Sequence, residues 1–178
     1  MLLLPGRGTR LKGHADALAL LAALRNDGLD ARLWMPGARD PARTAYVAEL
    51  EARATALDVG DAVAITAPTS AIAAAYAASD LVLQLSRKPE AFGRTVVEAL
   101  SVGRHVLGWD HGGVGELLRE LQPAGAVRAF DAAALHAAAR TLLSPTGTPA
   151  FTMPFDATRY SLQAMQDATL AVYDELRR

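Results

Sequence analysis

The sequence contains no cysteine, which excludes disulfide bonds, thiolate metal sites and a cysteine nucleophile. It also lacks any run near the ~18 apolar residues that a membrane-spanning helix needs. The opening residues Met1–Leu4 are too short for a signal peptide, so we expect a soluble chain. Neither sign of charge dominates, because 18 Lys and Arg residues oppose 19 Asp and Glu residues. This balance argues against a general surface for nucleic acid or anionic membranes.

What the sequence does contain is enough for a stable core. Its 178 residues are 51% apolar and 21% charged, which suits one domain and excludes a disordered chain. The cations are almost all arginine, and the only two lysines in the sequence are Lys12 and Lys88. These two positions are therefore worth inspecting for a specific role.

Short apolar runs alternate with longer amphipathic stretches, and this alternation predicts the secondary structure. The runs expected to form buried strands are Leu2–Leu4, Ala31–Met35, Ala62–Ile65, Leu81–Leu85, His105–Gly108 and Ala126–Ala129. The stretches expected to form helices are Lys12–Asn26, Ala42–Leu57, Ser70–Ala77, Arg94–Val102, Val114–Leu121 and Ala132–Leu143. Such alternation is typical of βαβ units, so we expect an α/β fold with a doubly wound parallel sheet.

This organisation divides the chain and predicts where a ligand binds. We expect a Rossmann-like domain over residues 1–143, a proline-rich strap over 144–156 and a C-terminal helix over 157–178. Ligands of such sheets bind outside the carboxyl ends of the strands. The loops expected at that rim are Pro5–Lys12, Pro36–Pro41, Thr66–Thr69, Ser86–Gly93 and Trp109–Gly113.

The first rim loop, extended to Gly13, combines three glycines with three cations. Glycine lets the backbone approach a ligand, and a helix N-terminus offers unpaired N–H groups to an anion. Arg7, Arg10 and Lys12 therefore suggest a clamp for a diphosphate, the alternative being a solvated basic loop. The loop lacks both the Gly-x4-Gly-Lys-Ser/Thr order of a Walker A loop and the third glycine of Gly-x-Gly-x-x-Gly.

The fourth rim loop supplies two carboxylates around a helix start. Glu90 lies in the loop, Gly93 opens the helix, and Glu98 follows one to two turns later, roughly 6–9 Å along the helix axis. Two carboxylates so placed can accept hydrogen bonds from different hydroxyls of one extended ligand, with a phosphate at the helix start between them. The alternatives are an ion pair of Glu98 with Arg94, in the less favourable order, and a helix-dipole carboxylate at Glu90.

The fifth rim loop again opens a helix with paired glycines, Gly112 and Gly113. Beside them, His111 could donate to a phosphate or sugar oxygen, or could be a surface loop histidine. The remaining histidines are expected to be packing or surface residues: His14, His105 and His136. The sequence shows neither metal-ligand spacing nor a Ser-His-Asp set.

Taken in order, these motifs resemble those of a known family. They are Gly6-Arg7-x4-Lys12-Gly13, Tyr76-x2-Ser79-Asp80-Leu81, Ser86-x3-Glu90-Ala91-Phe92-Gly93-x4-Glu98-Ala99, Gly103-x2-Val106 and Gly112-Gly113-x2-Glu116. The chain resembles the C-terminal, donor-binding domain of retaining glycosyltransferases of family four (glycosyl transferases group 1), which have the two-domain GT-B architecture. Residues 84–118 look most like bacterial envelope-polysaccharide enzymes. The sequence departs from the family at His105, where proline is usual, and in the weakly glycine-rich second rim loop.

The resemblance implies a role for each matching residue. Arg7 and Lys12 would neutralise the donor diphosphate and Glu90 would hold the transferred sugar, so these three are the expected catalytic residues. Glu98 would bind the ribose, and the base would lie near Thr66–Pro68. The full set of donor-binding residues expected is Gly6, Thr66, Phe92, Gly93, Arg94, Thr95, Glu98, His111, Gly112 and Gly113. The resemblance implies a nucleotide-diphosphate sugar as substrate and neither metal nor cofactor, because cations and a helix dipole supply the positive charge.

The resemblance also implies partners. A complete enzyme of this type needs an N-terminal acceptor-binding domain, so we expect this chain to be an isolated donor half that transfers little or nothing alone. The acceptor would be a saccharide or lipid-linked saccharide, nucleic acid is not expected, and the whole enzyme would be cytoplasmic, at the inner face of a membrane. A second reading is a freestanding nucleotide-sugar-binding module without turnover. A dinucleotide-binding oxidoreductase is disfavoured, since no acidic residue ends the second strand.

Overall fold

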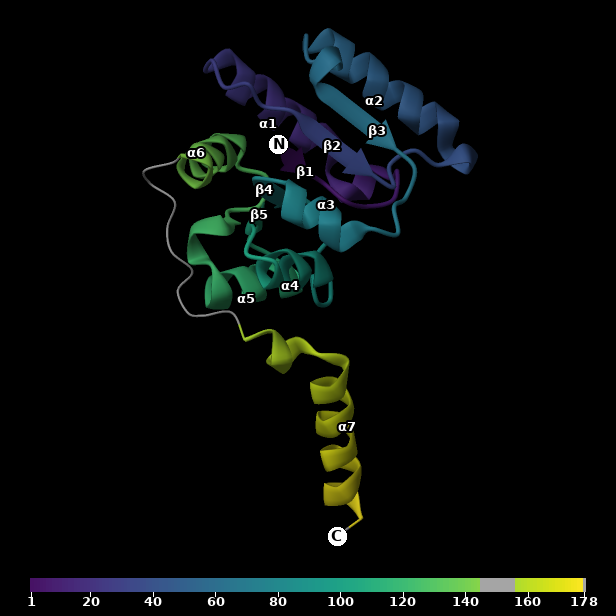
Figure 1. Ribbon diagram of the computed structural model, residues 1–178, viewed down its shortest axis with the longest axis vertical. Helices are drawn as coiled ribbons and strands as arrows, with labels where there is room; N and C mark the ends of the chain where they lie inside the picture. Colours follow the sequence, from purple (N-terminus) through teal and green to yellow (C-terminus); the bar gives the residue numbers. More distant parts are fainter. Residues whose placement is uncertain (145–155, 178) are drawn as a thin grey trace.

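The computed structural model describes residues 1–144 and 156–177, and within them six parallel strands form one sheet in the order β3-β2-β1-β4-β5-β6 (Figure 1). The strands are β1 (Leu2–Leu3), β2 (Leu33–Pro36), β3 (Val63–Thr66), β4 (Leu81–Gln84), β5 (His105–Trp109) and β6 (Ala126–Val127). Each overlaps one of the predicted runs. The predicted α/β class with a doubly wound parallel sheet is therefore confirmed.

Helices cover both faces of the sheet. On one face lie α1 (His14–Asn26), α2 (Thr44–Ala56) and α6 (Ala132–Leu143); on the other lie α3 (Ile72–Ala78), α4 (Arg94–Ser101) and α5 (Gly112–Leu121). Short 3-10 helices occur at η1 (Arg10–Lys12), η2 (Pro41–Arg43), η3 (Gly60–Ala62), η4 (Pro123–Gly125) and η5 (Ala157–Tyr160). This layering explains why the central strands β1 and β4 are almost wholly apolar, since both of their faces are buried, whereas Ala64 of the edge strand β3 is exposed.

The side chains of the strands divide between two hydrophobic clusters with the period of two that a strand requires. Leu2 and Leu4 pack under α1, α2 and α6, whereas Leu3, between them, packs under α3, α4 and α5. Burial of each leucine stabilises the fold by about 1.5 to 3 kcal/mol. The buried amide of Gln122 adds a polar tie, because it accepts from Val106 N at 2.9 Å and donates to Val106 O at 3.1 Å.

Five helix starts differ from the sequence prediction by two residues or more, and local backbone chemistry explains two of them. The first helix begins at His14 rather than Lys12, because Gly13 at φ +77° interrupts the helix after η1. The C-terminal helix α7 (Leu162–Leu176) begins later than residue 157, because Ser161 accepts from Ala164 N and caps it. Residues 145–155 of the predicted strap lie outside the described residues.

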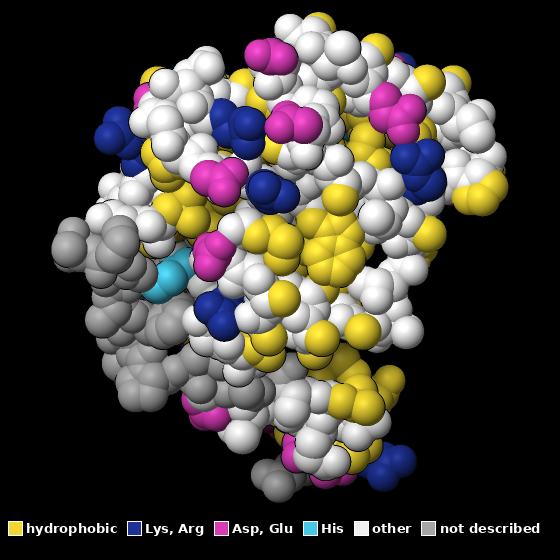
Figure 2. All heavy atoms as spheres, turned by 45° about the horizontal axis from the view of Figure 1, so that its top comes forward, with side chains coloured by type: hydrophobic (Ala, Val, Ile, Leu, Met, Phe, Trp, Pro, Cys, Tyr) yellow, Lys and Arg dark blue, Asp and Glu magenta, His cyan; other side chains and the backbone are white. Residues whose placement is uncertain are grey.

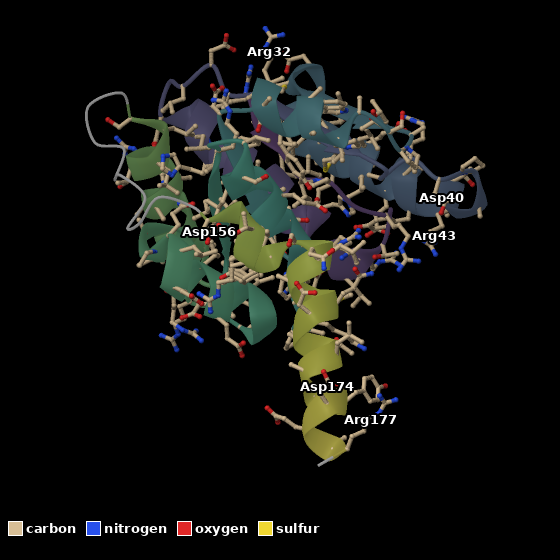
Figure 3. All side chains as sticks on the ribbon, turned by 60° about the horizontal axis from the view of Figure 1, so that its bottom comes forward. Arg32, Asp40, Arg43, Asp156, Asp174 and Arg177 are labelled. Atoms are coloured by element: carbon tan, nitrogen blue, oxygen red, sulfur yellow. The ribbon has the colours of Figure 1, made fainter. Side chains whose placement is uncertain are left out.

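Helix α7 projects away from the sheet (Figures 1 and 3). None of its described residues is buried, and Figure 3 shows Asp174 and Arg177 at its far end. The preceding η5 does contact the domain, through an Arg159–Glu120 ion pair and the ring of Tyr160, 6.2 Å from that of Phe92. The apolar stripe of α7 (Leu162, Met165, Val172 and Leu176) is exposed, and its first turns line a groove of about 520 Å³ together with Phe92 and Val97 of the domain.

The surface is mixed in charge, as the sequence predicts. On the face drawn in Figure 2, Lys and Arg side chains are interspersed with Asp and Glu, and apolar side chains lie between them. Among residues 1–144 and 156–177, no helix has the length and apolar character needed to cross a membrane.

Candidate functional site

The strand order reverses between β1 and β4, and the loops that follow these two strands meet at the carboxyl rim of the sheet. We call them the β1–α1 loop (residues 4–13) and the β4–α4 loop (residues 85–93). A cleft of about 580 Å³ lies between them. Its lining residues are Pro5, Gly6, Arg7, Lys12, Thr69, Ile72, Tyr76, Glu90, Ala91, Phe92, Gly93, Arg94, Thr95 and Glu98. A switch point of this kind is where open α/β sheets bind ligands.

The cleft brings together most of the site residues that the sequence predicts. Arg7, Lys12 and Glu90, the expected catalytic residues, all line it. Six of the expected donor-binding residues do so as well: Gly6, Phe92, Gly93, Arg94, Thr95 and Glu98. Three cations (Arg7, Lys12 and Arg94) and two acids (Glu90 and Glu98) therefore share one cleft, although their individual roles stay predictions.

Glu90 is the most heavily hydrogen-bonded side chain of the cleft. Its Oε1 accepts from Lys12 Nζ and from Ser86 Oγ, each at 2.5 Å, and its Oε2 accepts from Gln84 Nε2 at 3.1 Å. Burial alone would raise the pKa of Glu90, but the hydrogen bonds from Lys12, Ser86 and Gln84 outweigh it and hold that pKa below its ordinary value. Glu90 is therefore a fixed, ionised carboxylate.

Glu98 has a different partner, which sequence analysis missed. The phenol of Tyr76 on α3 donates to Glu98 Oε2 at 2.8 Å, while Arg94 Nε lies 3.9 Å from Oε1. Burial, followed by the hydrogen bond to Glu98 and its charge, raises the pKa of Tyr76 well above its ordinary range. Tyr76 therefore stays a donor and orients the carboxylate. Its place in the Tyr76-x2-Ser79-Asp80 motif was the available signal.

The N-terminus of α4 lies at the cleft, where its backbone N–H groups can bind an anion. Gly93 precedes it at φ +96°, and a Cβ there would lie 2.9 Å from Val114 Cγ2. Arg94 and Thr95 form the first turn and line the cleft. Their backbone N–H groups have no acceptor within the helix, which leaves them available to a phosphate.

Four predicted donor-binding residues lie outside the lining of the cleft. His111 Nε2 lies 2.9 Å from Ser86 O, and Gly113 N donates to Glu90 O at 2.8 Å, so both support the β4–α4 loop from behind. A Cβ on Gly112 would meet that same Glu90 carbonyl at 2.8 Å. The oxygens of Thr66 are engaged by Trp34 Nε1 and by backbone N–H groups of residues 37 and 39. Thr69, rather than Thr66, lines the cleft from that side.

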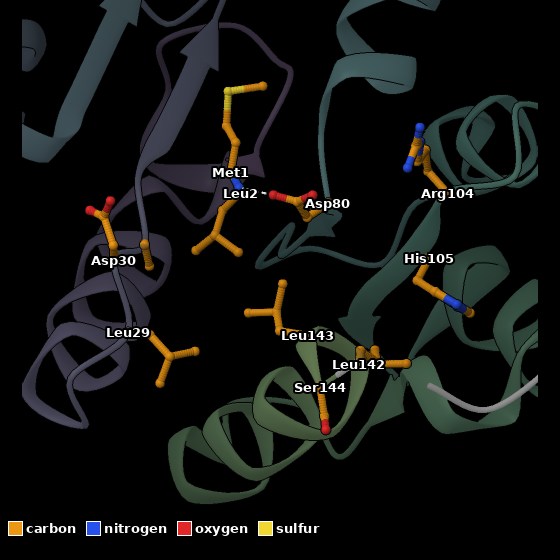
Figure 4. A pocket seen from close by; sticks show the side chains of 11 residues that line it. Met1, Leu2, Leu29, Asp30, Asp80, Arg104, His105, Leu142, Leu143 and Ser144 are labelled. Carbon is orange, nitrogen blue, oxygen red and sulfur yellow. Dashed lines mark hydrogen bonds and ion pairs between the residues drawn. The ribbon is translucent and has the colours of Figure 1, made fainter. Parts of the chain in front are cut away.

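A second hollow, of about 400 Å³, lies at the opposite rim, beside the amino ends of the strands (Figure 4). Figure 4 shows the amino group of Met1 joined to Asp80, with Arg104 and His105 across the hollow and Leu142 at its base. Apart from this ion pair, its charged groups are dispersed among leucines and do not converge. Ligands of parallel sheets bind at the other rim, so the cleft between the β1–α1 and β4–α4 loops is the candidate site.

The part of the chain that the structure describes contains no group of three or more His, Asp or Glu residues placed to hold a metal ion. Within the cleft, Arg7, Lys12 and Arg94 supply positive charge, and the start of α4 adds the positive end of a helix dipole.

His14 supports the β1–α1 loop from within the core. It is 0% exposed, and its Nδ1 lies 3.3 Å from both Thr9 O and the Tyr46 hydroxyl. Burial lowers the pKa of His14 from 6.5 to about 4; the hydrogen bond to Thr9 opposes this shift and the charge of Lys12 adds to it. His14 is therefore neutral in the folded protein at neutral pH.

The burial of His14 predicts that the free energy of unfolding decreases at acid pH. Between the two pKa values the unfolded chain binds a proton at His14 and the folded chain does not, so stability falls as the pH falls through that window. We expect a loss of about 1 to 2 kcal/mol between pH 7 and pH 5 in urea unfolding. His14→Gln should remove this loss, whereas His136→Gln, at a half-buried site beside Asp27, should keep it. An unchanged loss in His14→Gln would contradict the assignment.

Comparison with solved structures shows how widely this fold occurs. A glycosyltransferase from Rickettsia africae ESF-5 is 24% identical, with a TM-score of 0.81 over 99% of this chain and 48% of that one. Anabaena HepE, solved with UDP and glucose, is 22% identical, with a TM-score of 0.75 over 94% and 48%. Sucrose-phosphate synthase from Thermosynechococcus elongatus is 23% identical, with a TM-score of 0.73 over 98% and 45%. The chain thus spans about half the length of these structures.

No curated protein sequence matches the chain. A sequence profile of one family does match, and it covers residues 1–150, which include both loops of the cleft and every residue that lines it. On the strength of that match, the chain belongs to the glycosyl transferases group 1 family.

Proposed function

We propose that this chain is the donor-binding half of a retaining glycosyltransferase that takes a sugar from a nucleotide diphosphate. The observation that carries this proposal is the gathering of Arg7, Lys12, Glu90 and Glu98 in one cleft at the switch point of the sheet. A nucleotide sugar has a matching order of groups: a ribose, a charged diphosphate and a second polyol. The binding of UDP and glucose by the Anabaena structure is consistent with such a ligand.

Each part of the cleft suits one part of that ligand. Arg7, Lys12 and the first turn of α4 would bind the diphosphate and stabilise its growing negative charge as the sugar leaves. These groups would do so without a metal ion or other cofactor. The ionised Glu90 would accept hydrogen bonds from hydroxyls of the transferred sugar.

Glu98 would bind the ribose. Tyr76 occupies its Oε2, which leaves Oε1 to accept from a ribose hydroxyl. The base would lie beyond it, toward Thr69 and Ile72 on the far wall of the cleft. A second domain, at the N-terminal side of the complete enzyme, would hold the acceptor, for which we propose a saccharide or lipid-linked saccharide of a bacterial envelope.

Calorimetric titration of the chain with uridine, guanosine and adenosine diphosphates tests this proposal. We expect at least one of them to bind, and Glu98→Ala to weaken that binding by about threefold to tenfold, because it removes one hydrogen bond to a carboxylate that is 41% exposed. Glu90→Ala should not weaken it, because Glu90 is assigned to the sugar, which a bare nucleotide lacks. Indifference to all three nucleotides at millimolar concentration would refute the proposal, and equal losses would overturn the assignment of the two acids.

A further inference from the structure

The Lys12 ammonium group lies within reach of two anions, the Glu90 carboxylate and the proposed diphosphate. In the structure its ammonium group contacts Glu90 Oε1 at 2.5 Å, and the same side chain lines the cleft next to Gly6 and Arg7, where the diphosphate is proposed to bind. An ammonium group is a compact point charge with three donors. An ammonium group that is held by Glu90 interacts more weakly with a phosphate. Glu90 is therefore positioned as an internal competitor of the ligand.

We infer that Glu90 makes the cleft discriminate against a bare nucleoside diphosphate and in favour of one that carries a sugar. This inference rests on the proposed function and assigns Glu90 a specificity-determining role within it. A bare diphosphate draws Lys12 away and leaves a partly buried carboxylate beside new negative charge. A sugar hydroxyl donates to that carboxylate and compensates for the loss.

The surroundings of Glu90 prevent it from avoiding this conflict. Gln84 and Ser86, which are 4% and 5% exposed, hold both of its oxygens from the side of the sheet. Gly113 N fixes its backbone carbonyl at 2.8 Å. Because these partners are buried, the carboxylate cannot swing into solvent when Lys12 leaves. It therefore stays in place and faces the ligand.

Glu98 provides a built-in contrast, since it carries the same charge in the same cleft. Its hydrogen-bonded partner is the neutral Tyr76, and its nearest cation, Arg94, lies 3.9 Å away with a side chain that is 83% exposed. Neutralising Glu98 therefore releases no cation that is engaged in a close contact. It removes only a ligand acceptor and one unit of negative charge.

These differences give opposite expectations for two matched substitutions. The probe is whichever of uridine, guanosine and adenosine diphosphate binds the wild-type chain most tightly, titrated by calorimetry together with its glucose conjugate. Glu90→Gln should bind the bare nucleotide about threefold to tenfold more tightly, because Lys12 is freed. The gain should be smaller or reversed for the glucose conjugate. Glu98→Gln should bind the nucleotide more weakly, and Glu175→Gln, near the far end of α7, should leave its affinity unchanged.

A double-mutant cycle shows whether the effect passes through Lys12. In a Lys12→Met background, Glu90→Gln should produce little of its gain, since no ammonium group remains to be released. Circular dichroism spectra of all variants check that the fold is intact, and glutamine at position 90 can still accept from Ser86. The inference is overturned if Glu90→Gln leaves nucleotide affinity unchanged or lowers it, or if the gain persists without Lys12. Failure of the wild-type chain to bind any nucleotide would instead refute the proposed function itself.

Discussion

Gly13→Ala is expected to destabilise the protein by roughly 2 to 5 kcal/mol, the sum of the cost of a left-handed backbone and that of a steric clash. Gly13 has φ +77° and joins η1 to α1. A Cβ at this position would lie 2.0 Å from Leu85 O and 2.7 Å from Leu85 Cβ. Because Leu85 is fully buried, neither atom can move aside. The measurement is the free energy of unfolding in urea.

The same substitution should damage the candidate site. Gly13 is the point where the β1–α1 loop touches the start of the β4–α4 loop, and the neighbouring Lys12 contacts Glu90. Any shift that relieves the clash moves Lys12 relative to the cleft. We therefore expect nucleotide affinity to fall even at temperatures where the variant is folded.

Gly28→Ala is the matched control. Gly28 has φ +86°, close to that of Gly13, but a Cβ there has nothing within 4 Å. The free energy of unfolding of Gly28→Ala should fall only by the cost of the left-handed conformation, about 1 to 2 kcal/mol. Its affinity for nucleotide should stay unchanged. Equal losses of stability in the two variants would show that the clash with Leu85 does not contribute to the destabilisation.

The strands and helices of the sheet could be predicted because each is determined by the pattern of apolar residues within its own segment. A strand that is buried on both faces has a short run of apolar residues. The helices between these runs have apolar residues spaced three and four apart. The rim that carries the cleft followed from the parallel topology, since ligands of such sheets bind outside the carboxyl ends of the strands. The strand order, which the structure supplies, shows that the loops after β1 and β4 meet at the switch point. What no local pattern encodes is which side chains pair there. Lys12 and Glu90 are 78 residues apart, and the contact that joins them exists only in the folded chain.

The glycines of the fifth rim loop show a second limit. Paired glycines permit close approach of a backbone, but the sequence does not say whether a ligand or another loop approaches. In the structure a Cβ on Gly113 would lie 2.5 Å from Phe92 O, so the close neighbour is the β4–α4 loop. Similarly, the C-terminal helix expected over residues 157–178 is present as α7, but the sequence gave no information about what that helix packs against.

Lys12→Met is expected to weaken binding of a nucleoside diphosphate by roughly 30- to 150-fold, which corresponds to about 2 to 3 kcal/mol. The methionine keeps much of the length and apolar stem of lysine but removes the ammonium group. Lys88→Met is the matched control, since Lys88 is the other lysine of the sequence, lies exposed in the β4–α4 loop and does not line the cleft. Similar losses in the two variants, measured by calorimetry at one salt concentration, would assign the effect to general charge rather than to Lys12.

A second readout does not depend on any ligand. The folded-state pKa of Glu90 lies below its ordinary value of 4.5, so the ionised carboxylate stabilises the fold above that pH and this contribution is lost as the pH falls through the folded-state value. Lys12→Met removes one of the hydrogen bonds that lower this pKa, and burial then counts for more. The variant should therefore lose less stability than the wild-type chain between about pH 6 and pH 3 in urea unfolding. Lys88→Met should follow the wild-type curve, because the Lys12 ammonium group still holds Glu90 in its ionised form.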